Sequence, residues 1–221
     1  MAPPPSFTLF GERKLDSPFV FTAFVALAEK RVEFTARLLD LSSGEQRAAD
    51  FARRSFTRRV PTLEAGAFAL SESVAIVEYL DELLPPPEFP RLLPDGIEGR
   101  ARARQVLGWL RTDLTALRRA RPSDSIFYPN DRVTTPLDAA ARKDAERLVA
   151  IAVELVGDQP NLFGPWSIAD ADLALFLMRL HANGDPLPPE LVRYVEAQWR
   201  RPCVVAWTAL ERPAAQSELR L

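Results

Sequence analysis

The length, composition and charge of the chain set the first limits on its fold and function. It has 221 residues, of which 47% are hydrophobic, enough for a substantial core in one large domain or two modest ones. A formal net charge of −2 argues against nucleic acid or an anionic membrane as the main partner. Its single cysteine, Cys203, excludes an internal disulfide, and its single histidine, His181, excludes a multi-histidine metal site.

The apolar runs and the first residues give no sign of membrane insertion or secretion. No apolar run reaches the roughly 18 to 20 residues that a helix needs to span a bilayer. The start of the chain, MAPPPSF, lacks the basic and apolar parts of a secretory signal. We therefore expect a cytoplasmic protein that binds neither a membrane nor nucleic acid.

The first residues of the chain alternate between strand and helix patterns. Residues 7–10 alternate as a short strand, and Ser17 and Pro18 then fit the N-cap and first position of an apolar helix. Residues 32–38 alternate again, which favours a parallel pair of strands joined by a crossover helix. The polar residues 42–58 are predicted to hold a short helix.

The next stretch, RRVPTLEAGAFALSES from Arg58, predicts a strand, a tight turn, a returning strand and the start of a helix. Pro61 gives no backbone donor, so we expect a cis Val60–Pro61 bond that leaves the Val60 backbone free to pair with an extended ligand. The residues from Ser71 to Ser73 offer hydroxyls and unpaired amides at a positive helix end. Together these features indicate a groove for an anionic peptide; the simpler alternative is an ordinary strand start and an ordinary helix cap.

A run of prolines divides the chain into two predicted domains. Residues 1–84 have the element order of a thioredoxin-like domain, residues 85–95 form a linker, and residues 96–221 are expected to be all helical. The predicted helices are residues 96–121, 137–156, an apolar one that begins after Gly164, 191–199 and 204–210. Ser167 and Asp170 have the spacing of a capping box at the start of the apolar helix.

Residues 122–136 are predicted to be a loop that is too long for a plain connection. The loop either closes over a pocket or is simply mobile. Its aromatic residues, Phe127 and Tyr128, and Trp109 either line a pocket or pack within the fold. We expect His181 to lie on a helix surface or to pack between domains, and Cys203 to be a small apolar packing residue.

Four motifs carry a resemblance to a known family. They are SPFVFTAFVAL from Ser17, TRRVPTL from Thr57, LSESVAIVEYL from Leu70 and NLFGPWSIADADLAL from Asn161. In this order and spacing they resemble the cytosolic glutathione S-transferases, and most of all a bacterial serine-type branch, the YfcF type, whose overall look is closer to the tau and omega classes. The resemblance implies an α/β plus all-α fold, with an N-terminal thioredoxin-like domain followed by a C-terminal helical bundle domain, and a homodimer. In one departure, Ser55 and Phe56 stand where Asn-Pro often precedes Val-Pro.

The resemblance also implies a site and a co-substrate, glutathione, with no metal. The implied site residues are Ser17, which activates the glutathione thiol, Arg59, which meets the glycyl carboxylate, Val60 with Pro61, which pairs with the cysteinyl backbone, and Glu72 and Ser73, which hold the γ-glutamyl group. No histidine lies close to Ser17 in the sequence, so the serine is expected to donate a hydrogen bond to a thiolate rather than attack as a nucleophile.

The activity that the resemblance implies is conjugation of glutathione to small electrophiles, as in detoxification, or glutathione-dependent reduction of peroxides. No Gly-x-Ser-x-Gly elbow supports a hydrolase. The alternative is a non-catalytic relative that keeps the fold as a binding or assembly module.

Overall fold

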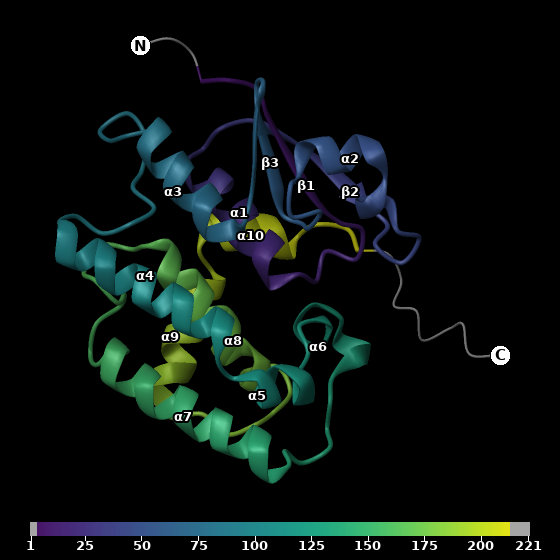
Figure 1. The fold of residues 1–221 in the computed structure, drawn as a ribbon. Helices are drawn as coiled ribbons and strands as arrows, with labels where there is room; N and C mark the ends of the chain where they lie inside the picture. Colours follow the sequence, from purple (N-terminus) through teal and green to yellow (C-terminus); the bar gives the residue numbers. More distant parts are fainter. Residues whose placement is uncertain (1–3, 213–221) are drawn as a thin grey trace. The chain divides into compact units, whose positions relative to one another are not determined.

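The computed structural model describes residues 4–212, which divide into two compact units (Figure 1). The first unit contains the described residues up to Leu92 and those from Ala209 on, and the second is Leu93–Thr208. The first unit holds β1 (Phe7–Glu12), α1 (Pro18–Glu29), β2 (Phe34–Leu39), η1 (Glu45–Arg47), α2 (Ala49–Arg54), β3 (Thr62–Ala65), β4 (Phe68–Ser71) and α3 (Ser73–Leu83). The second holds α4 (Ile97–Thr112), α5 (Thr115–Ala120), α6 (Asp124–Phe127), η2 (Pro129–Asp131), α7 (Ala139–Val156), α8 (Ile168–His181), α9 (Pro189–Trp199) and α10 (Pro202–Thr208).

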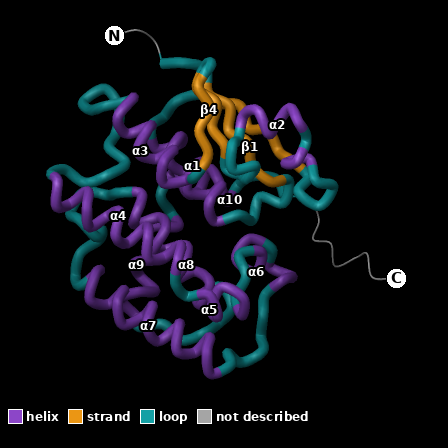
Figure 2. The backbone as a smooth tube through the Cα atoms, viewed as in Figure 1, coloured by secondary structure: helices purple, strands orange, loops and turns teal. Residues whose placement is uncertain are grey.

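The first unit is built on a four-stranded mixed sheet with the strand order β2-β1-β3-β4 (Figure 2). Strands β1 and β2 run parallel, while β3 runs antiparallel to both β1 and β4. Helices α1 and α3 pack on each other over one face of the sheet, and α2 lies over the other (Figure 1). This is the thioredoxin-like domain that the sequence predicts, and the second unit is the predicted helical domain.

A buried ion pair joins the end of α1 to α3 within the first unit. The Lys30 ammonium lies 3.0 Å from Oδ1 of Asp81 and donates to the carbonyl of Leu84 at 2.8 Å. The same Asp81 oxygen accepts the backbone N–H of Leu92 at 2.8 Å. Because both charged side chains are excluded from water, removing either one leaves an uncompensated buried charge, which costs about 3 to 5 kcal/mol. The pair therefore fixes the position of α3 relative to α1.

Helix α8 forms the centre of the helical unit. All its residues from Ile168 to Leu180 are buried, and α4, α7 and α9 pack against it. The predicted capping box is confirmed: the Ser167 side chain accepts the N–H of Asp170, and the Asp170 carboxylate accepts the N–H of Ser167 at 2.8 Å. The most apolar predicted helix is therefore the core of its unit.

The single long helix predicted for residues 96–121 is wrong, because the chain breaks between α4 and α5. Leu114 has a left-handed backbone with φ of 60°. Its N–H is accepted by the Asp113 carboxylate at 2.9 Å, and Asp144 of α7 accepts the next free amides, those of Ala116 and Leu117 at 2.9 and 3.1 Å. These carboxylates satisfy amides that would otherwise bond within a continuous helix, so the break follows from a contact with a distant helix.

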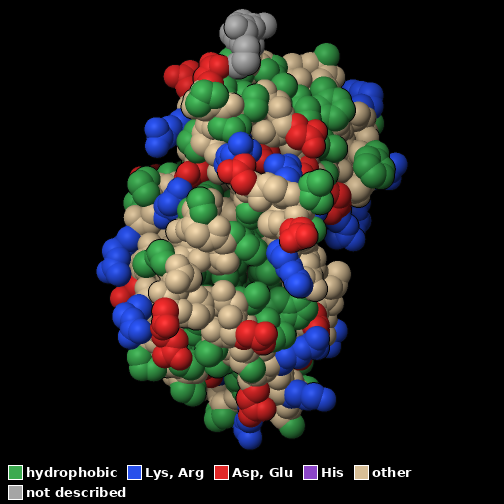
Figure 3. Space-filling view, turned by 90° about the vertical axis from the view of Figure 1, so that its left-hand side faces the viewer, with side chains coloured by type: hydrophobic (Ala, Val, Ile, Leu, Met, Phe, Trp, Pro, Cys, Tyr) green, Lys and Arg blue, Asp and Glu red, His purple; other side chains and the backbone are tan. Residues whose placement is uncertain are grey.

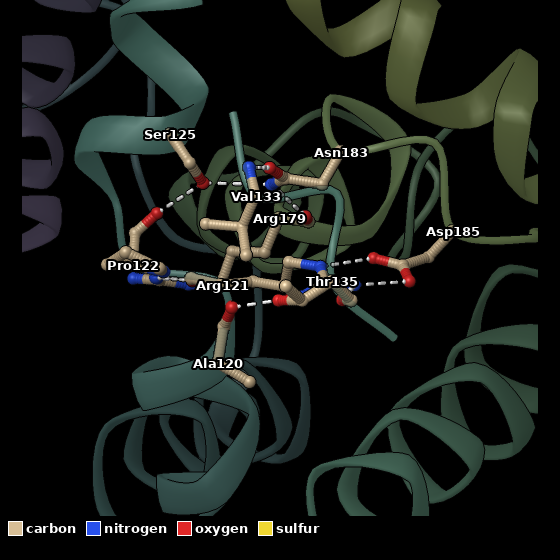
Figure 4. A network of polar contacts seen from close by, with 9 residues as sticks. All are labelled: Ala120, Arg121, Pro122, Ser125, Val133, Thr135, Arg179, Asn183 and Asp185. Carbon is tan, nitrogen blue, oxygen red and sulfur yellow. Dashed lines mark hydrogen bonds and ion pairs between the residues drawn. The ribbon is translucent and has the colours of Figure 1, made fainter. Parts of the chain in front are cut away.

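The segment predicted as a long loop, residues 122–136, contains α6 and η2 and is held to the end of α8 (Figure 4). Just before the segment, Arg121 pairs in a bidentate manner with Asp185, at 2.6 and 2.8 Å. Asn183 donates to the Ser125 hydroxyl at 2.8 Å and accepts the N–H of Val133 at 2.6 Å. Polar contacts with the residues after α8 therefore order the segment.

Charged side chains of both signs are mixed over the face of the molecule shown in Figure 3, as the near-neutral net charge leads one to expect. Across residues 4–212, no helix is both long and apolar enough to cross a bilayer. The same residues contain no group of three or more His, Cys, Asp or Glu side chains that could hold a metal ion.

Candidate functional site

The strand register brings the predicted site segments of the first unit to one edge of the sheet. Across the sheet, Phe10 of β1 pairs with Thr62 of β3, which in turn pairs with Ser71 of β4. Strands β1 and β4 run in the same direction, so the segments that follow them both leave at this edge. The segment that precedes β3 enters there too. All six predicted site residues, Ser17, Arg59, Val60, Pro61, Glu72 and Ser73, lie in these three segments.

Ser17 caps the first of these segments, the start of α1. It has an extended backbone, and its Oγ accepts the N–H of Val20 at 3.3 Å, with Pro18 at the first helical position as the sequence predicts. The hydroxyl is half-buried. Oγ accepts one hydrogen bond for the cap, and the hydroxyl donates none to any residue among 4–212. Ser17 therefore keeps a free donor at the positive end of an apolar helix.

The second segment carries the Val60–Pro61 bond, which is cis, as predicted. Neither backbone polar group of Val60 has a hydrogen-bond partner within the described part of the chain. The side chain of the preceding residue, Arg59, is exposed, and its guanidinium has no ion-pair partner among residues 4–212. This turn thus presents a backbone donor and acceptor beside a free cation.

Hydroxyl groups of Ser55, Thr57, Thr62 and Ser71 hold this turn in place, and only that of Ser71 was considered from the sequence. The buried Ser55 hydroxyl donates to the Arg59 carbonyl at 3.2 Å and accepts the Arg59 N–H at 3.3 Å. The Thr62 hydroxyl donates to the same carbonyl at 2.8 Å, and Thr57 donates to the Ser71 hydroxyl at 3.0 Å. Ser55 stands where the Asn-Pro departure begins, so the departure is compatible with an ordered turn. The only signal available in the sequence was the spacing of Ser55 and Thr57, two residues apart before the turn.

The third segment is the start of α3. Glu72 is the N-cap residue but has no capping side-chain bond, and its backbone is strained, with φ of 76° at a non-glycine position. Its side chain is exposed, whereas Ser73, the first residue of the helix, is buried. An uncapped helix start attracts anions because its first amides and its dipole are both positive. The helix end therefore offers backbone amides and the exposed Glu72 carboxylate.

The sequence reading also missed Glu12, whose side chain is hydrogen-bonded to the backbone of the segment that contains Ser17. Its Oε1 accepts the N–H groups of Asp16 and Ser17, both at 2.8 Å. Burial raises the pKa of the Glu12 carboxyl from 4.5 to about 7, against the lowering effect of these bonds. In the sequence FGERKLDS nothing distinguishes Glu12 from a solvated loop residue.

The three aromatic residues considered as a pocket lining all lie in the helical unit. The Trp109 indole donates to the Asp113 carboxylate at 3.2 Å. Phe127 makes an edge-to-face contact with Trp207, at 6.0 Å between ring centroids, and Tyr128 is buried. Trp109 and Phe127 therefore each have a side-chain partner within this unit.

Comparison with known proteins identifies the class to which this fold and site belong. Residues 16–83 match the model of the glutathione S-transferase N-terminal domain, and residues 96–212 match that of the C-terminal domain. The chain therefore belongs to the glutathione S-transferase family.

Two solved structures illustrate the likeness over the full length. A glutathione transferase homolog from Burkholderia gl BGR1, solved with bound glutathione, is 40% identical, with a TM-score of 0.74 over 91% of this chain and 95% of that one. The theta class glutathione S-transferase from Xanthomonas axonopodis pv. citri, also with glutathione bound, is 24% identical, with a TM-score of 0.73 over 94% and 99% of the two chains. At that identity the second structure shows a shared fold.

The curated relatives match over shorter stretches. A maleylacetoacetate isomerase from Dictyostelium discoideum is 34% identical over 42% of this chain, and rat glutathione S-transferase theta-1 is 25% identical over 80% of it. The alignments span 42% of the Dictyostelium protein, 37% of human theta-1 and 75% of rat theta-1. The chain thus spans about two fifths of the length of the first two.

Proposed function

We propose that this protein is a serine-type glutathione transferase, in which Ser17 stabilises the thiolate of glutathione for addition to a small electrophile. The observation that supports the proposal most directly is that the Ser17 hydroxyl accepts a hydrogen bond but donates none within the described residues. The bond that it accepts comes from the Val20 N–H and caps α1. The capping role and the donor role are therefore compatible in one side chain.

The energetics of this arrangement suffice for thiol activation. A thiol with a pKa of about 8.5 must fall by about two units to be mostly ionised at neutral pH, which corresponds to about 2.7 kcal/mol. A hydrogen bond to a charged group supplies about 1.5 to 3 kcal/mol, and a helix end up to about 2 kcal/mol more. A hydroxyl at the start of α1 can therefore activate the thiol without a general base or a metal.

Recognition of the rest of glutathione falls to the other two segments at the same sheet edge. The unpaired backbone of Val60 pairs with the cysteinyl unit, and the Arg59 guanidinium meets the glycyl carboxylate. Glu72 and Ser73 hold the ammonium and carboxylate of the γ-glutamyl end. The Arg59 cation and the positive start of α3 are opposite in charge to the two carboxylates of glutathione, and the Glu72 carboxylate is opposite in charge to its ammonium.

The decisive experiment compares Ser17→Ala with the wild type, using glutathione and a chlorodinitrobenzene. We expect turnover at neutral pH to fall by about tenfold to a hundredfold, equivalent to about 1.4 to 2.7 kcal/mol, with glutathione binding largely kept. The apparent thiol pKa, read from the ultraviolet absorption of the bound thiolate, should rise. Ser17→Thr keeps a hydroxyl and should restore most of the activity.

Glu72→Ala provides the contrasting variant. Because it removes a partner of the γ-glutamyl end, it should weaken glutathione binding in calorimetry while leaving the thiol pKa unchanged. If Ser17→Ala abolished binding and left the pH profile untouched, Ser17 would be only a cap. Glutathione binding without turnover in the wild type would favour the alternative, a binding or assembly module.

Three finer points belong to the same proposal. Assignment to the YfcF-type branch rests on the four motifs in order. We also propose that the protein reduces peroxides with glutathione as a side activity. A hydroperoxide assay, with Ser17→Ala as the control, tests this activity. Domain limits of 1–84 and 96–221 assign glutathione binding to the first part. The protein is a homodimer, so a monomer mass at micromolar concentration in light scattering contradicts this point.

A further inference from the structure

The turn between β1 and α1 is built around the Glu12 side chain. Glu12 is the last residue of β1, and it is 5% exposed although it belongs to a turn with exposed neighbours, Arg13 and Lys14. Its backbone carbonyl accepts the N–H of Leu15 at 3.2 Å, and Leu15 has a left-handed backbone with φ of 54°. The side chain is therefore enclosed by the turn that leads to Ser17.

The two oxygens of the Glu12 carboxyl differ in their partners. Oε1 accepts both the Asp16 and the Ser17 N–H, each at 2.8 Å. Oε2 is buried and has no hydrogen-bond partner among the described residues. Burying an ionised carboxylate with an oxygen that has no hydrogen-bond partner costs free energy. A neutral carboxyl group with its proton on that oxygen has a smaller desolvation cost. The geometry thus favours the protonated form without disturbing the two amide bonds.

The charges around Glu12 do not offset this preference. Asp16, in the same turn, is an acid and raises the pKa of the Glu12 carboxyl further. Arg13, the next residue in the chain, is a cation but does not pair with Glu12. Its guanidinium lies 3.7 Å from the Asp40 carboxylate and 3.8 Å from that of Glu45, in the segment that follows β2. The first turn of α1 contributes neither an acidic nor a basic side chain, because it begins with Pro18 and apolar residues. Burial, with the Asp16 charge added, therefore holds the pKa of Glu12 at about 7.

We propose that Glu12 is a positioning residue for Ser17, and that its protonation is coupled to the charge that the start of α1 stabilises. The second half of this inference rests on the proposed function, because the charge concerned is the glutathione thiolate. Glu12 holds the backbone of the cap residue itself through the Ser17 N–H. The carboxyl group that gains or loses the proton is therefore hydrogen-bonded to the backbone of Ser17, the residue proposed to contact the thiol.

The coupling has a definite sign. A neutral Glu12 leaves the positive end of α1 to the thiolate, whereas an ionised Glu12 places a second negative charge near the same end. Like charges disfavour one another, so a thiolate at Ser17 should raise the pKa of Glu12, and an ionised Glu12 should oppose thiolate formation. Across neutral pH the two groups share one favourable site for negative charge.

The test follows the backbone amide signals of Asp16 and Ser17 by nuclear magnetic resonance as a function of pH, first without glutathione. In the wild type both signals should titrate together with a midpoint of about 7. In Glu12→Gln, whose amide oxygen can still accept both N–H bonds, the titration should disappear while the signals of α1 remain. Asp16→Asn is the matched control: its Ser17 signal should still titrate, at a slightly lower midpoint, because a neighbouring charge is gone.

The second arm adds glutathione to the wild type. Saturating glutathione should move the midpoint of the Asp16 and Ser17 signals upward, and in Ser17→Ala the movement of the Asp16 signal should be smaller. A midpoint near the ordinary value of 4.5, or a titration that persists in Glu12→Gln, overturns the proposal. The wild-type midpoint decides the matter even if Glu12→Gln does not fold. If glutathione shifts other amide signals but leaves a midpoint of about 7 unmoved, the positioning role stands and the coupling is wrong. If glutathione shifts no amide signal at all, the proposed glutathione function fails instead.

Discussion

The turn before α1 and the start of α8 share one feature, a buried carboxyl group, but differ in the hydrogen bonds that this group makes. Each places a buried carboxyl group beside the cap of a helix that is largely enclosed by protein: Glu12 is 5% exposed and Asp170 is 0% exposed. In both places burial raises the pKa of the carboxyl group. The two groups differ in how many donors surround them.

Asp170 has a complete set of donors. Its Oδ1 accepts the Leu162 N–H at 2.7 Å and the Tyr194 hydroxyl at 3.0 Å, and its Oδ2 accepts the Ser167 N–H at 2.8 Å and the Ser167 hydroxyl at 3.0 Å. All these bonds oppose the rise of the pKa of Asp170. Glu12 has donors on one oxygen only. Asp170 therefore has a donor for each of its lone-pair positions, whereas Glu12 is buried with donors on one oxygen only, and its pKa is about 7.

The largest effect should come from removing the Asp170 carboxylate. Asp170→Ala should lower the free energy of unfolding by at least about 3 kcal/mol, because it removes a cap worth about 0.5 to 2 kcal/mol and leaves buried donors unsatisfied at about 1 to 3 kcal/mol each. Denaturant unfolding of the purified protein measures this loss.

Asp138→Ala is the matched control, because Asp138 caps α7 through the Ala141 N–H at 2.8 Å but is exposed. It should cost only about 0.5 to 2 kcal/mol, the value of a cap alone. Equal losses in the two variants would mean that the burial of Asp170 and its extra donors contribute nothing.

The raised pKa of Glu12 should appear as a pH dependence of stability. Because the pKa of Glu12 is about 7 in the folded protein and ordinarily 4.5, the folded state keeps a proton that the unfolded chain releases in this interval. Its contribution is therefore fully present below pH 4.5 and is lost as the pH rises through about 7. The difference of about 2.5 units amounts to about 3 kcal/mol.

Glu12→Gln, which cannot ionise, should lack this component. Unfolding curves at several pH values should show the variant more stable than the wild type, by up to about 3 kcal/mol at about pH 8, and similar to it at about pH 4. Parallel pH profiles for the two proteins would show that Glu12 does not titrate in this range.

A smaller change makes Asp170 more like Glu12. Tyr194→Phe removes one of the four donors without altering the size of the ring, and should cost about 0.5 to 1.5 kcal/mol. The Tyr194 hydroxyl lowers the pKa of Asp170, so its loss should raise that pKa. A pH titration of the Asp170 carboxyl-carbon resonance measures the shift. An unchanged midpoint would mean that the number of donors does not set the pKa of this carboxyl group.

Much of the fold and part of the candidate site follow from the sequence, because local patterns carry them. The Ser17–Pro18 helix start, the cis Val60–Pro61 bond and the Ser167–Asp170 capping box involve residues within three positions of one another. Steric and hydrogen-bond preferences at such short separations are set by the residue types themselves. The element order that gives the thioredoxin-like and helical domains is likewise visible as changes of apolar period along the chain.

Only the tertiary structure decided the features that depend on distant residues or on exclusion of water. The break at Leu114 is supported by Asp144 from α7, which no local pattern announces. The Thr57–Ser71 hydroxyl bond joins residues that are neighbours only after β4 has folded back. Glu12 makes short-range bonds, but its pKa comes from burial, and burial is a property of the assembled turn and not of the residue type. The sequence therefore determines which groups can meet, and packing determines whether a carboxyl group keeps its charge.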